Sequence, residues 1–256
     1  MRTVQVQGEQ IPALGIGTWQ LTGARGRRVV VEALDLGYRH IDTAQMYGNE
    51  GAIGEALQTT MVDRGELWIT TKIANGNHAP QDVRRSTEES LHQLGTEYVD
   101  LLLIHWPAQF DMLPRTLEAM RGLHEEGKAR YLGVSNFSPT QLETALEHAS
   151  LLTNQVEYHP FIEQRALLDL CRRRDLMLTA YSPLAQGRVQ DDRTLKEVAE
   201  RRRKTASQVA LRWLIDQDNV SAIPKASSRE HLQDNLAIFD FELTDEDRAA
   251  IDGIAW

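Results

Sequence analysis

Apolar and polar positions alternate along this chain with a long, regular period. Short apolar runs typical of buried strands recur every 25 to 35 residues or so, the length of one strand plus one helix. Leu101 to Ile104 is apolar without a break, as expected of a parallel strand buried on both faces. The predicted strands cover residues 15–19, 38–42, 67–72, 100–105, 129–135, 153–157, 177–180 and 221–223.

Amphipathic helical patterns lie between these runs. Ser138 followed by Pro139 predicts a helix start, and Gly37, Gly95 and Gly127 stand where helices should end. The predicted helices cover residues 25–36, 51–59, 80–94, 114–126, 139–148, 164–174, 194–202, 207–216, 228–235 and 244–251.

This alternation predicts an α/β fold, a (β/α)8 TIM barrel that forms one domain over residues 1–256. Residues 4–6 and 11–14, with Gly8 between them, predict a β-hairpin that caps the barrel floor. A doubly wound sheet is the alternative fold. Its glycine signature is incomplete, because residues 15–20 carry two of the three glycines.

Composition narrows the class of protein. The formal net charge of −9 argues against a nucleic-acid or anionic-membrane partner. The single Cys171 cannot form an internal disulfide and is expected to be a packing thiol. Because the first residues show no signal segment and no apolar run approaches membrane-spanning length, we expect a cytoplasmic enzyme.

Chemistry-bearing side chains follow the predicted strands. Asp42, Lys72, His105 and Asn136 each come directly after an apolar run, and Tyr47 lies in the loop after Asp42. Because strand ends converge on one face of a barrel, we expect these side chains to meet there. Taken singly, each residue has an ordinary structural role, as a rim aromatic, a strand-end charge, a helix cap or a rim histidine.

An acid, a phenol, an amine and an imidazole at one rim suit proton transfer to a carbonyl. The unperturbed pKa of a phenol is near 10, too high for efficient catalysis at neutral pH. We expect the Lys72 ammonium to lower the pKa of Tyr47 by two or three units, an interaction of roughly 3–4 kcal/mol. Asp42 would keep Lys72 charged, and His105 would orient the carbonyl.

Eight short motifs occur in the order found in one family, and the chain resembles the aldo-keto reductases from Ile11 to about Asp252. It is similar in particular to small bacterial 2,5-diketo-gluconate and methylglyoxal reductases. The motifs are Gly15-Ile-Gly-Thr-Trp19, Ile41-Asp-Thr-Ala-Gln-Met-Tyr-Gly-Asn-Glu50, Thr70-Thr-Lys72, Leu103-Ile-His-Trp-Pro107, Gly133-Val-Ser-Asn-Phe137, Asn154-Gln-Val-Glu-Tyr-His-Pro160, Ala180-Tyr-Ser-Pro-Leu184 and Ile223-Pro-Lys225.

The resemblance implies reduction of aldehydes and ketones (small carbonyls, ketoaldehydes or keto-sugar acids) with NADPH, by a monomer without a metal. It implies Tyr47 as general acid, Lys72 and Asp42 as its tuning pair, and His105 as the carbonyl-orienting residue. Trp19, Trp106 and Tyr158 are expected as apolar walls for the substrate, beside Tyr47 and His105. The implied cofactor contacts are Gly17, Thr18, Trp19, Asp42, Ser135, Asn136, Gln155, Tyr181, Ser182, Pro183, Leu184, Lys225, Ala226, Ser227, Ser228, His231 and Asn235.

The segment after the last strand bears on cofactor choice. By resemblance, Lys225 and Ser228 meet the adenosine ribose or its 2′-phosphate, while Ser227 and Glu230 match a capping box. NADP-preferring relatives carry arginine where this chain has His231, which cannot grip a phosphate with two hydrogen bonds. We therefore expect NADPH to be favoured and NADH tolerated.

Two further readings remain open. A nucleotide sensor could keep this fold without turnover, although the four proton-handling residues argue against it. Metal-dependent hydrolysis lacks a His-x-His pair or a His-Glu-x-x-His run. The ending, residues 251–256, forms a short tail where many relatives continue into a loop over the substrate, so we expect an open pocket and broad specificity.

Overall fold

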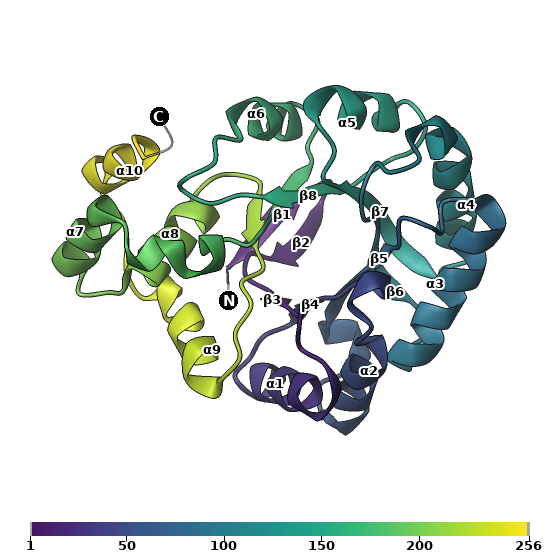
Figure 1. Cartoon of the computed structure of the whole chain (residues 1–256), viewed down its shortest axis with the longest axis horizontal. Helices are drawn as coiled ribbons and strands as arrows, with labels where there is room; N and C mark the ends of the chain where they lie inside the picture. Colours follow the sequence, from purple (N-terminus) through teal and green to yellow (C-terminus); the bar gives the residue numbers. More distant parts are fainter. Residues whose placement is uncertain (1, 255–256) are drawn as a thin grey trace.

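Eight parallel strands form a closed barrel in the computed structural model, which describes residues 2–254 (Figure 1). Each strand pairs with the next along the chain, so the strands lie in sequence order from β3 to β10. The strands are β3 (Ile16–Gly17), β4 (His40–Asp42), β5 (Trp68–Ile73), β6 (Val99–Ile104), β7 (Ala129–Ser135), β8 (Thr153–Glu157), β9 (Met177–Tyr181) and β10 (Val220–Ala222).

Backbone hydrogen bonds between the first and last strands close the ring. Leu14 forms a parallel bridge with Ala222, and the Gly15 N–H donates to the Ala222 carbonyl at 2.9 Å. The Gly17 N–H donates to the Pro224 carbonyl at 3.1 Å. The predicted (β/α)8 barrel is therefore confirmed.

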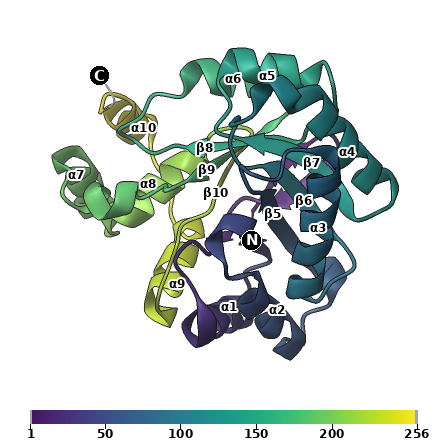
Figure 2. The ribbon, with the colours of Figure 1, turned by 45° about the vertical axis from the view of Figure 1, so that its right-hand side comes forward.

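Helices surround the barrel, as Figures 1 and 2 show from two directions. Two helices, α7 and α8, lie between β9 and β10, where the sequence pattern predicts two. The helices are α1 (Gly23–Asp35), α2 (Glu50–Thr59), α3 (Pro80–Leu94), α4 (Leu113–Glu125), α5 (Pro139–Leu146), α6 (Arg165–Arg173), α7 (Arg193–Arg202), α8 (Ala206–Ile215), α9 (Arg229–Leu236) and α10 (Asp245–Asp252).

The local start and stop signals act as predicted. The Ser138 hydroxyl accepts a hydrogen bond from the Gln141 N–H, and the Gln141 side chain accepts from the Ser138 N–H, which completes a capping box at α5. Gly95 ends α3 in the left-handed conformation, with φ +64°. Helix ends with such signals are set by a few neighbouring residues.

The predicted hairpin covers the floor of the barrel. Strands β1 (Thr3–Val6) and β2 (Glu9–Pro12) are antiparallel and joined at Gly8, whose φ is +81°. The Gln7 side chain donates to the carbonyls of Leu151 at 2.8 Å and Asp175 at 3.1 Å, just before β8 and β9 begin. The opposite end of the barrel, where the strands finish, stays free for a site.

The interior of the barrel is partly polar, unlike the apolar layer between barrel and helices. Hydroxyls of Thr153, Thr179 and Ser221 lie close together, with 3.0 Å between the first two. Gly133 leaves no room for a side chain, because a Cβ there would lie 2.7 Å from Leu103 Cδ2.

Cys171 is buried, which raises its pKa to about 12, as expected of a packing thiol.

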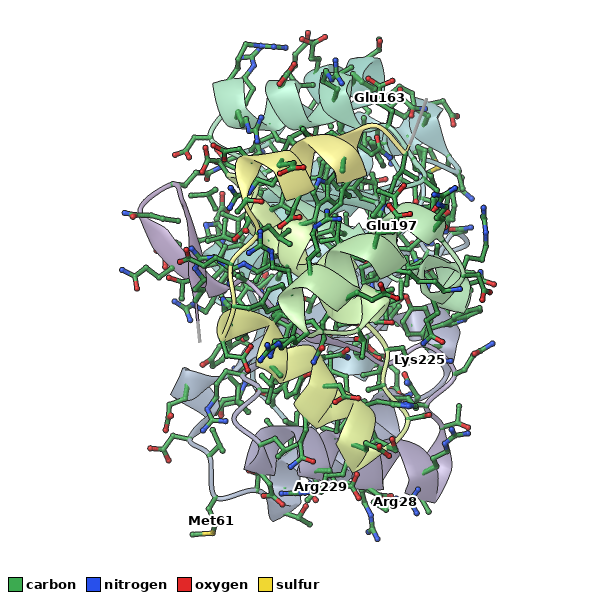
Figure 3. All side chains as sticks on the ribbon, turned by 90° about the vertical axis from the view of Figure 1, so that its left-hand side faces the viewer. Arg28, Met61, Glu163, Glu197, Lys225 and Arg229 are labelled. Atoms are coloured by element: carbon green, nitrogen blue, oxygen red, sulfur yellow. The ribbon has the colours of Figure 1, made fainter. Side chains whose placement is uncertain are left out.

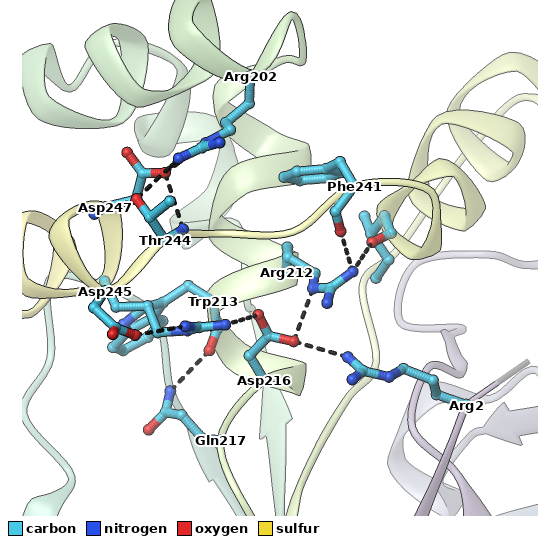
Figure 4. Close-up of polar contacts among 12 residues, drawn as sticks. Arg2, Arg202, Arg212, Trp213, Asp216, Gln217, Phe241, Thr244, Asp245 and Asp247 are labelled. Carbon is cyan, nitrogen blue, oxygen red and sulfur yellow. Dashed lines mark hydrogen bonds and ion pairs between the residues drawn. The ribbon is translucent and has the colours of Figure 1, made fainter.

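Ion pairs fasten the last helices. Asp216, which directly follows α8, binds Arg2, Arg212 and Arg248 (Figure 4). Asp247 of α10 binds Arg202, as Figure 4 also shows, and Arg201. Both carboxylates are buried, so each of them is matched by more than one cation. Within residues 2–254, no helix is long and apolar enough to cross a membrane.

Candidate active site

A cleft of about 390 Å³ opens at the carboxyl ends of the barrel strands. It brings together residues from seven strands and their following loops, and most of the predicted site residues line it. The predicted residues on its walls are Gly17, Thr18, Trp19, Asp42, Tyr47, His105, Trp106, Ser135, Asn136, Gln155, Tyr181, Ser182 and Lys225.

Lys72 lies at the base of this cleft, behind Tyr47. It ends the inward-facing row of β5, and its side chain is completely buried. Its Nζ donates to Asp42 Oδ1 at 2.5 Å and to the Thr43 carbonyl at 2.7 Å, and it lies 3.3 Å from the Tyr47 hydroxyl. These three oxygens match the three donors of an ammonium group.

The cation is kept charged by its neighbours. Burial alone would lower the pKa of Lys72, but the Asp42 carboxylate and the Tyr47 oxygen more than offset this, and the pKa is raised. The second Asp42 oxygen accepts a hydrogen bond from Gln155 Nε2 at 2.7 Å. Asp42 is thus held by both of its oxygens and anchors the ammonium in place.

The expectation for the pKa of Tyr47 is wrong in direction. Burial raises the pKa of Tyr47, and the Lys72 ammonium offsets only part of that rise, while Asp42 adds to it. Removal of the phenol from water is the larger effect here. Tyr47 therefore keeps its proton at neutral pH, which is the form that can donate one.

His105 stands beside Tyr47, with the two rings edge to face and 5.6 Å between their centroids. Burial and the nearby Lys72 lower its pKa to about 3, so the imidazole is neutral at pH 7. Its buried Nδ1 has no hydrogen-bond partner among the described residues. A neutral imidazole offers one donor and one acceptor, so it can position a carbonyl oxygen without carrying a charge.

Another part of the cleft lining is a hydrogen-bonded row of amides and hydroxyls, from Ser135, Asn136, Gln155 and Tyr181. Asn136 has φ +63° after β7, and its Nδ2 donates to the His105 carbonyl at 3.0 Å. The Tyr181 hydroxyl donates to Asn136 Oδ1 at 2.9 Å, and the Ser135 hydroxyl donates to the Gln155 carbonyl at 2.8 Å. Through Asn136 and Gln155 this row is hydrogen-bonded to the His105 backbone and to Asp42.

The predicted residues after β10 lie toward the rim and beyond the cleft. Lys225 is exposed and donates to Gln20 Oε1 at 2.8 Å, and Figure 3 shows the outer face that carries Lys225 and Arg229. Besides the buried Lys72, the predicted residues outside the cleft lining are Pro183 and Leu184 after β9, and Ala226, Ser227, Ser228, His231 and Asn235 after β10.

Two details of the predictions are wrong. Ser228, not Ser227, caps α9, and its hydroxyl accepts from the His231 N–H at 3.3 Å. Tyr158 is not a wall of the cleft. Since side chains alternate along β8 and the residues after it, Tyr158 points outward, packs on Trp213 and donates to Gln217. The predicted tail ends at Ala255 and Trp256, outside the described residues.

Four residues of the cleft lining were not predicted from the sequence: Met46, Glu157, Gln186 and Ile223. The alternation of strands could have found two of them, because Glu157 follows Gln155 by two positions and Ile223 likewise follows Ser221. Gln186 has φ +56° in an irregular segment, which no periodic pattern reveals.

No group of three or more potential metal ligands occurs within residues 2–254.

Comparisons with known proteins agree with this geometry. Residues 13–255 match the family model described as the aldo/keto reductase family. Glyoxal reductase from Bacillus subtilis strain 168 is 39% identical over 96% of this chain and 90% of its own length. A 9,11-endoperoxide prostaglandin H2 reductase from Trypanosoma cruzi strain CL Brener is 38% identical, over 95% of this chain and 87% of that protein.

Solved structures show the same arrangement. A putative 2,5-diketo-D-gluconic acid reductase B superposes with a TM-score of 0.97 at 42% identity, covering 99% of this chain and 91% of that one. An aldo/keto reductase from Brucella melitensis gives a TM-score of 0.94 at 38% identity, with 98% of each chain covered.

Proposed function

Because this chain belongs to the aldo/keto reductase family, a family of oxidoreductases, we propose that it reduces aldehydes and ketones to alcohols with NADPH, with Tyr47 as the general acid. The observation that carries the proposal is the buried Lys72 ammonium, 2.5 Å from Asp42 and 3.3 Å from the Tyr47 hydroxyl. That hydroxyl faces a cleft large enough for a small carbonyl compound.

Tyr47 supplies the proton. Its phenol is neutral at rest and donates to the carbonyl oxygen as negative charge develops there. The phenolate that remains lies beside the Lys72 ammonium, which stabilises it, and Asp42 keeps that ammonium charged. A positioned acid of this kind contributes about 10²- to 10⁴-fold in rate.

His105 positions the carbonyl. Its neutral imidazole donates one hydrogen bond to the same oxygen and thereby aims it at Tyr47. A charged imidazolium would compete with Tyr47 as the acid and would repel Lys72. The low pKa of His105 removes that competition at physiological pH.

The row of amides and hydroxyls in the cleft fits a nicotinamide dinucleotide. Ser135, Asn136 and Gln155 offer the amides and hydroxyl that a carboxamide requires, and the Tyr181 ring is a flat surface held by Asn136. Lys225 and the first turn of α9 offer charge and N–H groups to phosphate. When bound, the reduced cofactor supplies the hydride.

NADPH is the favoured cofactor in this proposal and NADH is tolerated. The support is the exposed Lys225 at the rim together with His231 at a position where NADP-preferring relatives carry arginine. The test compares kcat/KM for the two cofactors with one substrate. A preference for NADPH above about a thousandfold, some 4 kcal/mol, contradicts the proposed tolerance of NADH.

The central test is NADPH oxidation with methylglyoxal, a ketoaldehyde, by the wild type and Tyr47→Phe. We expect kcat to fall about 10²- to 10⁴-fold in the variant, while NADPH binding followed by fluorescence stays within about twofold. An unchanged rate overturns the acid role of Tyr47. Binding of NADPH without turnover by the wild type identifies a sensor instead of a reductase.

We propose further that the protein acts as a single-domain monomer in the cytoplasm. The monomer is what the family resemblance implies, and the solitary, buried Cys171 suits a reducing compartment. Light scattering after size-exclusion chromatography at working concentrations tests the oligomeric state. A mass of two or more chains contradicts it.

A further inference from the structure

The segment that carries Tyr47 has little structure of its own. Residues 43–49, the Tyr47 loop, join β4 to α2 and contain a single 3₁₀ turn, Gln45–Tyr47, that ends at Gly48 with φ +61°. Such a turn is too short to fix a side chain unaided. The position of Tyr47 therefore depends on what holds the loop from outside.

The Gln45 side chain binds the loop to the connection that follows β5. Its Oε1 accepts from the Ala74 N–H at 2.9 Å and from Asn77 Nδ2 at 3.1 Å, both in the connection after β5. Its Nε2 donates to the Ser90 hydroxyl of α3 at 3.3 Å. One side chain thus links the Tyr47 loop to two other elements.

Glu50 also links this region to β5 and α3. It is the first residue of α2 and only 4% exposed. Its Oε1 accepts from the Thr71 hydroxyl at 2.5 Å, and its Oε2 lies 3.1 Å from the Ser90 hydroxyl. Ser90 is thus the common point of contact, and Thr71 is the neighbour of Lys72 on the same strand.

The other flank of the loop is fastened by Asn49. Its Nδ2 donates to the carbonyls of Thr18 and Leu21, each at 2.9 Å, and its Oδ1 accepts from the Thr43 hydroxyl at 2.8 Å. The loop is therefore held to the barrel rim on one side. At its start the loop is also bonded to β5, because the Thr43 N–H donates to the Thr70 carbonyl at 2.9 Å and the Thr43 carbonyl accepts from Lys72 Nζ at 2.7 Å. Between Thr43 and Tyr47, the Gln45 side chain holds the loop to the connection after β5 and to α3.

We propose that Gln45, Ser90 and Glu50 form a positioning network that sets the distance between the Tyr47 hydroxyl and Lys72. The inference builds on the proposed acid role of Tyr47. The 3.3 Å separation is near the outer limit of a useful hydrogen bond, so a small displacement breaks it. A misplacement of about 1 Å can lower a rate about 10²-fold.

The test uses Gln45→Met, which keeps the length of the side chain and removes its three hydrogen bonds. We expect kcat with methylglyoxal to fall at least about tenfold, with the KM values for NADPH and for the carbonyl within about twofold. Gln141→Met is the matched control, because Gln141 also holds an element by hydrogen bonds but at α5. An unchanged kcat in a folded Gln45→Met protein overturns the proposal.

A double variant separates positioning from general loosening. In a Tyr47→Phe background, Gln45→Met should lower the residual rate less than about twofold, because the group that it positions is gone. A tenfold further loss in that background contradicts a role through Tyr47. Ser90→Ala, which removes the shared hydroxyl with little change in volume, replaces Gln45→Met if the latter does not fold.

A readout independent of turnover completes the experiment. The protein has six tyrosines, and with ¹³C at the ring ζ carbon the Tyr47 signal is assigned from its loss in Tyr47→Phe. We expect Gln45→Met to move that signal and leave the other five in place, and Gln141→Met to move none of them. An unmoved Tyr47 signal overturns the positioning role, whereas a moved signal in a protein that reduces no carbonyl leaves the network intact and rejects the proposed function.

Discussion

At the scale of single residues, the pairing of Lys72 with Asp42 joins stability to function. Both side chains are buried, so neither charge has water to solvate it, and each depends on the other. Lys72→Met should leave an unpaired carboxylate inside the barrel. We expect a loss of about 3–5 kcal/mol in the free energy of unfolding, measured by urea titration.

The matching double variant tells whether this loss comes from the stranded charge. Lys72→Met with Asp42→Asn removes both charges and should recover a good part of the stability, since no bare carboxylate remains. Equal stability of the single and double variants would show that the lost packing, not the charge, dominates. Carbonyl reduction should be absent in both.

Two buried histidines give the protein a predicted pH dependence. Burial lowers the pKa of His105 to about 3 and that of His40 to about 4, against 6.5 for a free imidazole. Between pH 6.5 and pH 4, both imidazoles stay neutral in the folded protein, whereas in the unfolded chain they take up protons. Stability is therefore complete above pH 6.5 and is lost as the pH falls toward 4.

Urea unfolding from pH 7 to pH 4.5 measures this loss. Each histidine accounts for at most about 1.4 kcal/mol per pH unit, and His105→Asn should flatten the slope by up to one proton. A slope identical to that of the wild type would show that His105 gains its proton without unfolding.

Residue-scale chemistry was only partly predictable. The sequence places Asp42, Lys72 and His105 at strand ends, and parallel strands bring such positions together. It gives no measure of how deeply Tyr47 is buried. Because burial outweighs the lysine, the sign of the pKa shift could not be obtained from residue types alone.

At the scale of elements, α2 and α3 pack so closely that a glycine is required between them. A Cβ on Gly54 would lie 2.1 Å from the Gln93 carbonyl oxygen, whereas a Cβ on Gly51 in the same helix meets nothing within 4 Å. Gly54→Ala should therefore cost about 1–3 kcal/mol of stability through overpacking. Gly51→Ala is the control and should stabilise by about 0.5 kcal/mol.

Thermal melts of the two alanine variants test this difference. A Gly54→Ala protein as stable as Gly51→Ala would mean that the helices shift apart at little cost. Because α3 also carries Ser90, such a shift would be visible in the Tyr47 signal described above.

Element boundaries were predictable where local chemistry decides them. Pro80 and Pro139 begin their helices as expected, and Gly95 ends α3, since the fixed φ of proline and the left-handed glycine act within a single turn. The expected strand 15–19 is only Ile16–Gly17, because its ladder with β4 ends at the pair Gly17 and Asp42. The cap of α9 was misplaced by one residue, a difference that needs the backbone angles of Ser228.

At the scale of the whole molecule, the overall negative charge continues into the cleft. Among the residues that the structure describes, Lys225 is the only lysine or arginine on its walls, and Glu157 adds a carboxylate. Beside Tyr47 the walls are the indoles of Trp19 and Trp106, which are 51% and 43% exposed. A substrate with its own negative charge would meet the Glu157 carboxylate on these walls, and the Lys225 ammonium is already hydrogen-bonded to Gln20.

A matched pair of ketones tests this consequence. Methyl benzoylformate and benzoylformate share one reacting carbonyl, but only the second is an anion at pH 7. We expect kcat/KM for the ester to exceed that for the acid at least about tenfold. Equal values would point to a cation that reaches the cleft when substrate binds.

The closure of the barrel also has a consequence for synthesis. Leu14 is synthesised 208 residues before its partner Ala222. Until then the nascent chain exposes an open sheet edge, which invites pairing with other chains. Chaperones that shield such an edge would matter most before β10 is translated.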